Sequence, residues 1–157
     1  MPDAAPVAVR RATLADAGTL GRLLWEFNTG FESPTDPAEV LAAWFGRLLE
    51  RDDVIALLAG ETDGFALVTL RPAIWFDGPV SQLEELYVVP DLRDRGIGTA
   101  ILTEARRLVR ERGSPEMHIN VDEVDADTRR FYERHGFLNV EEGVDYRMLC
   151  YIGSTGT

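Results

Sequence analysis

Apolar residues recur every three or four positions in four stretches of the chain, a spacing typical of amphipathic helices. Thr13 is placed to cap the first helix, which runs to about Asn28. Asp36 is placed to cap the second, with Pro37 at its first position and its apolar stripe ending at Leu49. Two further helices are predicted at Gly96–Arg112 and Asp127–His135.

Six shorter stretches, rich in β-branched and other apolar residues, predict strands. They are Val7–Arg11, Val54–Ala59, Phe65–Leu70, Val80–Val89, Met117–Val121 and Tyr146–Ile152. Strands in hairpin order come first, and a strand–helix–strand crossover follows, which implies a mixed sheet with helices on both faces. No repeat, linker or low-complexity tract divides residues 1–157, so we expect one domain.

Charge and composition narrow the classes of partner. The chain has 157 residues and a formal net charge of -11, with arginines gathered around positions 93–112 and acidic residues elsewhere. This charge argues against nucleic acid and anionic membranes, because binding to phosphate needs a basic face. Its single cysteine, Cys150, excludes an internal disulfide and favours a cytoplasmic location. The N-terminal ten residues show no secretory signal, and no cluster of residues predicts a metal site.

The glycine-rich turn between the strand ending at Val89 and the third helix carries the strongest chemical signal. Gly96 and Gly98 open that helix, and Arg93 and Arg95 precede them. Backbone N–H groups at a helix start, together with the helix dipole, favour a bound anion, and the arginines add positive charge. The sequence therefore predicts a phosphate site.

Two common phosphate motifs do not fit this turn. A dinucleotide fingerprint needs a third glycine or alanine, and Ile101 stands there instead. A P-loop needs a lysine, and the chain has none.

A third signature fits. The run Val88-x-Pro90-x-x-Arg93-x-x-Gly96-x-Gly98 resembles the acyl-CoA signature of the GNAT superfamily of N-acetyltransferases. Downstream, the run from Phe131 to Phe137 (Phe-Tyr-Glu-Arg-His-Gly-Phe) resembles a second element of that family. The resemblance covers nearly the whole predicted order of elements. It implies the acyl-CoA N-acyltransferase fold, with a mostly antiparallel sheet of six to seven strands.

The resemblance also implies the place of acetyl-CoA, the cosubstrate. Its pantetheine arm would lie where the strand ending at Val89 splays from the strand at Met117–Val121. Its pyrophosphate would rest on backbone N–H groups of the turn. Aspartate at position 125 departs from the family's usual asparagine, so it either contacts the CoA arm or caps the next helix, and Asn120 could replace it. The expected cofactor-binding residues are Val88, Val89, Pro90, Arg93, Asp94, Arg95, Gly96, Ile97, Gly98, Thr99, Asn120 and Asp125.

Catalytic residues are also implied. No serine–histidine or cysteine–histidine pair is evident, which favours direct attack by the amine in a ternary complex. The family places a tyrosine at position 132 as general acid toward the leaving sulfur. The run from Leu83 to Val88 resembles the strand of polyamine acetyltransferases in which two acids hold the amine, so Glu84 and Glu85 are the candidate bases. Adjacent strand residues face opposite sides, so we expect only one of the two to face the cleft. A backbone N–H of Val88 or Val89 would stabilise the oxyanion.

Loop residues are the candidates for binding the acceptor amine. Phe31, Trp75 and Phe76 fall in predicted loops and are candidate substrate-binding residues. The acceptor would be a primary amine of a small molecule or a peptide, and the donor either acetyl-CoA or a longer acyl-CoA. A non-catalytic acyl-CoA-binding regulatory module on the same fold is the alternative, and a homodimer is a family-level expectation.

Overall fold

A computed structural model describes residues 6–156, and the chain divides after Ile119 into two compact parts. The N-terminal part contains β1 (Val9–Arg11), the 3-10 helix η1 (Leu14–Asp16), α1 (Ala17–Gly30), α2 (Ala38–Leu49), β2 (Val54–Ala59), β3 (Gly64–Arg71), β4 (Val80–Val88), the 3-10 helix η2 (Pro90–Leu92), α3 (Ile97–Glu111) and β5 (Met117–Ile119). The C-terminal part, from Asn120 onward, contains α4 (Ala126–Arg134).

One sheet runs through the N-terminal part in the order β1-β2-β3-β4-β5. Strands β1 to β4 pair antiparallel with their neighbours, and β4 pairs parallel with β5. The prediction of a mixed, mostly antiparallel sheet is therefore confirmed, but the prediction of six to seven strands is wrong, since the described residues form five. Tyr146–Ile152 forms no strand, because β-propensity creates a strand only where a neighbouring backbone pairs with it.

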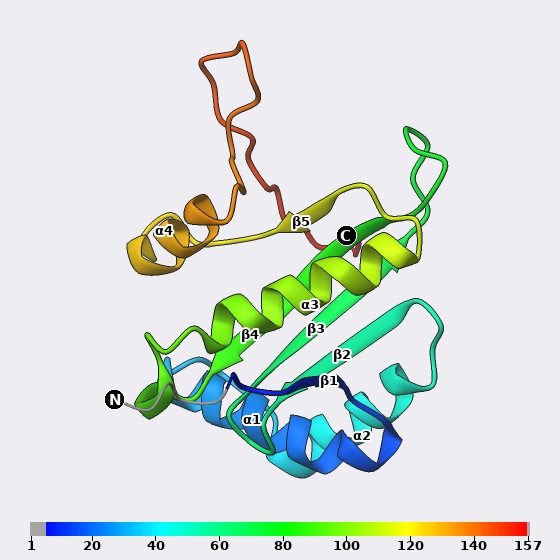
Figure 1. The fold of residues 1–157 in the computed structure, drawn as a ribbon, viewed down its shortest axis with the longest axis vertical. Helices are drawn as coiled ribbons and strands as arrows, with labels where there is room; N and C mark the ends of the chain where they lie inside the picture. Colours follow the sequence, from blue (N-terminus) through cyan, green and yellow to red (C-terminus); the bar gives the residue numbers. More distant parts are fainter. Residues whose placement is uncertain (1–5, 157) are drawn as a thin grey trace. The chain divides into compact units, whose positions relative to one another are not determined.

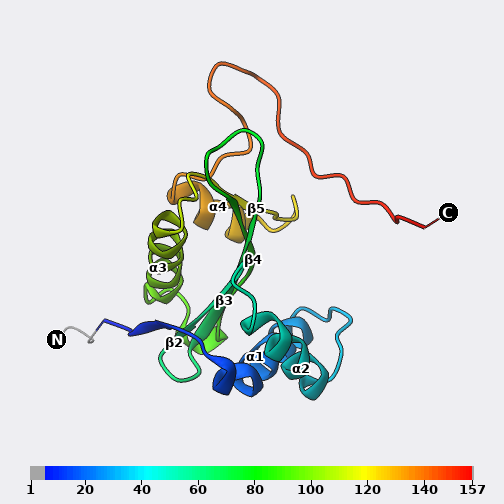
Figure 2. The same cartoon turned by 90° about the vertical axis from the view of Figure 1, so that its right-hand side faces the viewer.

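Helices cover both faces of this sheet, as the sequence predicted (Figures 1 and 2). Helices α1 and α2 lie on one face, where Leu20, Leu23 and Phe45 pack with Phe65 and Tyr87 in one hydrophobic core cluster. On the opposite face, α3 contacts β2, β3 and β4. Its buried residues are Ile97, Ile101, Leu102, Ala105 and Val109. No helix in the described residues is long and apolar enough to cross a membrane.

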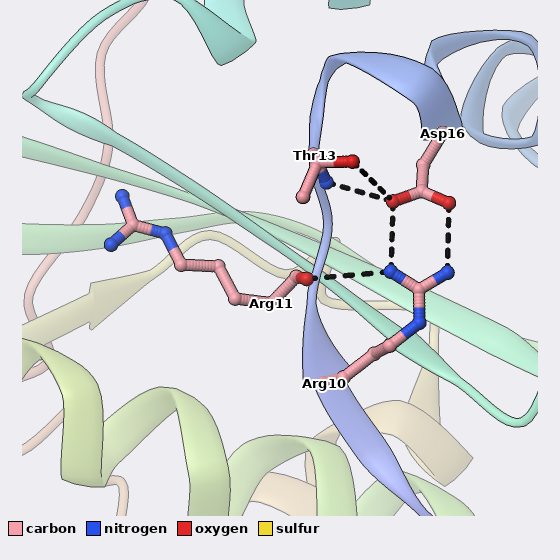
Figure 3. Close-up of polar contacts among 4 residues, drawn as sticks. All are labelled: Arg10, Arg11, Thr13 and Asp16. Carbon is pink, nitrogen blue, oxygen red and sulfur yellow. Dashed lines mark hydrogen bonds and ion pairs between the residues drawn. The ribbon is translucent and has the colours of Figure 1, made fainter.

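The chain enters α1 through an ion-paired turn at Asp16 (Figure 3). Two guanidinium nitrogens of Arg10 each donate to one oxygen of the Asp16 carboxylate at 2.8 Å. The Thr13 N–H also donates to that carboxylate, at 2.7 Å. The bonds from Arg10, followed by the bond from Thr13, hold the pKa of Asp16 well below its usual range. This turn fixes the direction in which α1 leaves the first strand.

The C-terminal part starts with an N-cap and ends without regular structure. The Asp125 carboxylate accepts a hydrogen bond from the Thr128 N–H at 3.2 Å and so caps α4. Gly136, with φ of +84°, follows the helix. From Leu138 to Gly156 the chain forms neither helix nor strand, and Figure 2 shows it as an extended segment, orange to red.

Candidate active site

The glycine-rich turn has the backbone geometry of an anion site. Asp94 and Gly96 both have positive φ, +60° and +82°, so the chain reverses sharply before α3 begins at Ile97. No side chain caps that helix, and a Cβ added at Gly96 would meet nothing within 4 Å. The first N–H groups of a helix have no intrahelical acceptor, so those of Ile97 and Gly98 are suited to hold an anion there.

Arg93 folds back across the end of β4. Its Nε donates to the Val88 carbonyl at 3.1 Å, and its guanidinium carbon lies 5.9 Å from the centre of the Tyr87 ring. Arg95 is exposed on the same turn. The two arginines that sequence analysis grouped together therefore have different surroundings.

Among the described strands, none pairs with the second half of β4 on the side away from β3, which we call the open side. The pairing with β5 covers Ser81 to Leu83 and ends there. The Val89 N–H donates to the Asp63 carbonyl at 2.9 Å, on the β3 side. In an antiparallel ladder the backbone N–H and carbonyl groups of consecutive residues point alternately to the two edges of a strand. The Val88 N–H therefore points to the open side. An extended ligand lying beside β4 would meet Val88 there.

A β-bulge in β4 places both glutamates on one face of the sheet. Leu67 pairs with Glu85 and Val68 with Leu83, so Glu84 is the extra residue. The Glu84 carboxylate accepts a hydrogen bond from Thr69 Oγ1 at 2.7 Å, and Thr69 shares with Leu67 the face covered by α1 and α2. The expectation that adjacent acids face opposite sides is wrong here, because the bulge interrupts the alternation.

The acid pair has unusual electrostatics. Glu85 is partly buried, and burial, followed by repulsion from Glu84, raises its pKa to about 7. Burial disfavours the charged form of a carboxyl, and a second carboxylate nearby disfavours it further. Glu85 can therefore accept and release a proton near neutral pH, which is the property a general base or acid needs.

A row of aromatic rings lies on the same face as the acid pair. The ring centres of Phe31 and Phe27 are 5.2 Å apart, and those of Phe27 and Tyr87 are 5.0 Å apart. Tyr87 lies two residues after Glu85 in β4. Burial, followed by the charge of Glu26, raises the pKa of the Tyr87 phenol, whereas Arg93 lowers it. Sequence analysis selected Phe31 from this row but missed Glu26, Thr69 and Tyr87, whose roles depend on the register and the bulge.

Trp75 and Phe76 lie elsewhere, in the loop that joins β3 to β4. They line a hollow of about 480 Å³ together with Ile74, Arg71 and the β5 residue His118, among others. The hollow borders Val80, where β4 starts, whereas the glycine-rich turn follows its other end. The structure therefore separates these two aromatic residues from Phe31.

Tyr132 belongs to α4 in the C-terminal part and is 9% exposed. Its ring packs edge-on against Phe131 and Phe137, with ring centres 5.2 and 5.8 Å away. The aromatic residues that the sequence motif groups together are thus in contact. Asp125 caps the same helix, as one of the two readings of that position predicted, and Asn120 is exposed.

Comparison with known proteins identifies similar chains. The model of the acetyltransferase (GNAT) family matches residues 19–137. A crystal structure of a proposed acetyltransferase from Arthrobacter sp. FB24 is 44% identical and covers 98% of this chain and 99% of its own, with a TM-score of 0.90. An aminoglycoside N(6′)-acetyltransferase type 1 of Stenotrophomonas maltophilia is 31% identical over 89% of this chain and 92% of its own length. An N-acetyltransferase of Methanocaldococcus jannaschii is 26% identical over 85% of this chain, which spans 61% of that relative.

Proposed function

Because this chain belongs to the acetyltransferase (GNAT) family, we propose that it transfers an acetyl group from acetyl-CoA to a primary amine of a small molecule or a peptide. The observation that carries the proposal is the acid pair on β4, where Glu85 has a pKa of about 7 beside Glu84. An amine enters the site mostly as an ammonium ion, so a group that takes a proton near neutral pH is required before attack.

The donor half of the reaction uses the glycine-rich turn and the open edge of β4. The pyrophosphate of acetyl-CoA would accept hydrogen bonds from the first N–H groups of α3, and Arg95 would add positive charge. The pantetheine arm would lie along the second half of β4. Arg93 holds the Val88 carbonyl in this structure, so this side chain would move as the arm binds.

Proton transfers complete the reaction. Glu85 takes the first proton of the ammonium, directly or through water, and the neutral nitrogen attacks the thioester carbon. The Val88 N–H, which points to the open side of β4, would donate to the oxyanion. The C–S bond then breaks as the amide forms, and the thiolate takes a proton from Tyr132, in the role that the family signature implies for that residue. The nitrogen of the tetrahedral adduct gives up its second proton, which replaces through water the one that Tyr132 donated, and Glu85 releases its proton to the solvent.

The acceptor that best suits this face carries more than one positive charge. Three carboxylates lie at the face of the sheet that α1 and α2 cover, namely those of Glu26, Glu84 and Glu85. The aromatic row of Phe31, Phe27 and Tyr87 lies beside them. Carboxylates pair with ammonium groups, and aromatic rings also attract cations. Polyamines and aminoglycosides both have this chemistry, and one relative of this chain is an aminoglycoside N(6′)-acetyltransferase.

Release of free CoA thiol from acetyl-CoA, measured with a panel of amines, tests this function. The panel contains polyamines, aminoglycosides, a monoamine and a peptide with a free N-terminus. We expect amine-dependent thiol release, faster with the polycations than with the monoamine. If calorimetry detects acetyl-CoA binding but no amine releases thiol, the chain is an acyl-CoA-binding module and the proposal is wrong.

A further inference from the structure

Thr69 lies in β3, the central strand of the sheet, on the face that carries the acid pair. Strand β3 pairs with β2 on one side, where Thr69 is opposite Val54, and with β4 on the other, where it is opposite Gln82. A β-branched side chain has few rotamers, and the two neighbouring strands hold the backbone of this residue. The position of the Thr69 hydroxyl is therefore well defined before any substrate binds.

This hydroxyl meets Glu84 at the bulge of β4. Leu83 and Glu85 pair with consecutive residues of β3, so Glu84 is the extra residue between them. Thr69 Oγ1 donates to the Glu84 carboxylate at 2.7 Å, a length typical of a hydroxyl that binds a carboxylate. Glu84 is exposed, and a glutamate side chain in water has several rotatable bonds. The bond from Thr69 therefore selects one position of this carboxylate.

The position of Glu84 determines how strongly its charge acts on Glu85. Burial raises the pKa of Glu85, and the charge of Glu84 raises it further, to about 7. Repulsion between two charges weakens as they separate and as water comes between them. If the Glu84 carboxylate turned away into water, it would therefore raise the pKa of Glu85 by less.

Other titratable groups surround the pair on the neighbouring elements. They are Glu26 of α1, Arg71 of β3, Tyr87 of β4, His118 of β5 and Arg93 after η2. Glu26 and Arg93 shift the pKa of the Tyr87 phenol. The causes that raise the pKa of Glu85 are instead burial and then the charge of Glu84. Because burial belongs to the fold, Glu84 is the charge through which a single side chain can adjust Glu85.

We propose that Thr69 is a positioning residue of this site, a role that rests on the proposed acetyl transfer to an amine. Its hydroxyl fixes the Glu84 carboxylate beside Glu85, where Glu84 holds the positive charge of the amine while Glu85 takes the proton. Thr69 acts through Glu84 and makes no contact with the amine in this role. Without the hydroxyl, the ammonium would lose a fixed partner and Glu85 would hold its proton less tightly.

Titration of the glutamate carboxyl carbons by NMR tests this role without any turnover. Glu85→Gln removes one resonance from the spectrum and so identifies that of Glu85. In the native chain we expect this resonance to titrate at about pH 7. In Thr69→Val, which keeps the shape of the side chain but not the hydroxyl, we expect its pKa to be lower by roughly half a unit. Thr69→Ser keeps the hydroxyl and should restore the native titration.

Steady-state kinetics test whether Thr69 serves the reaction. With a polycationic amine, Thr69→Val should raise KM for the amine roughly 3- to 10-fold, which is the size of effect expected from one hydrogen bond. KM for acetyl-CoA should stay at the native value. The rising limb of kcat/KM against pH should move to lower pH together with the NMR titration, because the deprotonated form of Glu85 is the base.

The matched control is Thr103→Val, which makes the same chemical change at an exposed position of α3, on the opposite face of the sheet. This variant should keep the native titration and both native KM values. If Thr69→Val leaves the titration of Glu85 unchanged or moves it to higher pH, the role of Thr69 is overturned. The expected titrations without amine-dependent thiol release from the native chain would instead overturn the proposed function, while the contact between Thr69 and Glu84 would stand.

Discussion

Replacing Glu85 by glutamine removes a carboxyl group whose charged form the folded protein disfavours. Glu85 is partly buried on β4, and burial, followed by the charge of Glu84, raises its pKa to about 7 from an ordinary 4.5. Between these two values the folded state binds more protons than the unfolded state does. The stability that Glu85 contributes is therefore present below about pH 4.5 and is lost as the pH rises through 7.

The size of this change in the free energy of unfolding follows from the two pKa values of Glu85, 4.5 and about 7. Each unit of pKa corresponds to about 1.4 kcal/mol, so the complete difference between the two pKa values would be roughly 3 kcal/mol. Because the side chain keeps part of its contact with water, we expect screening to reduce this to about 1–2 kcal/mol. Glutamine has nearly the same shape and no charge to desolvate. Glu85→Gln should therefore raise the free energy of unfolding above pH 7 relative to the native chain.

Urea unfolding of both proteins at about pH 5 and about pH 8.5 measures this effect. The advantage of Glu85→Gln over the native protein should be about 1–2 kcal/mol larger at the higher pH. Glu84→Gln is the matched control, because it removes the neighbouring charge but keeps Glu85. In that variant the loss of stability should be smaller and should end at a lower pH, since burial alone then raises the pKa of Glu85.

The same substitution should remove the base. We expect turnover of Glu85→Gln to fall by roughly 10²- to 10⁴-fold while the protein becomes more stable at high pH. If the difference in stability between Glu85→Gln and the native chain is the same at both pH values, Glu85 does not titrate near 7. The reasoning about the acid pair would then be refuted.

Three further substitutions test other parts of the structure. Tyr132→Phe should lower kcat by roughly 10²-fold or more with little change in Tm, and unchanged kcat at saturating substrates would exclude its role as acid. Gly96→Ala places a side chain at φ of +82°, so it should lower the free energy of unfolding by about 1–2 kcal/mol, measured with denaturant, and raise KM for acetyl-CoA. A native free energy of unfolding together with a native KM would contradict the geometry of the turn. Asp16→Asn should cost about 1 kcal/mol at neutral pH through weaker bonds to Arg10 and Thr13. Because the pKa of Asp16 is lowered in the folded protein, this difference should shrink as the pH falls below 4, and a difference independent of pH would argue against the ion pair.

Local features of the chain were predictable from sequence because local chemistry determines them. The glycines that open α3 and the apolar stripes of the helices specify a turn and four helices within a few residues. Pro37 shows the usual error at helix ends, since it is the N-cap of α2 rather than its first helical residue.

The arrangement of the acid pair was not predictable in the same way. The bulge at Glu84 leaves no mark in the pattern of apolar and polar residues, because it depends on how β4 registers with Leu67 and Val68 of β3. The same register directs the N–H groups of Val88 and Val89 to opposite sides of the strand. Sequence alone left both choices open, and pairing between strands decides them.

The last predicted strand shows a different limit. Tyr146–Ile152 has the composition of a strand, and composition is all that the sequence supplies. Whether such a segment becomes a strand depends on a neighbouring backbone that pairs with it, and composition does not specify that neighbour.

Following a labelled acetyl group by mass spectrometry tests the central claim most directly. The protein is incubated with acetyl-CoA labelled in the acetyl carbons, first alone and then with a polycationic amine. Direct attack predicts an unlabelled protein in both samples and one labelled acetyl group on a nitrogen of the amine. Label on the exposed thiol of Cys150 before amine is added, followed by its transfer to the amine, would contradict direct attack in a ternary complex.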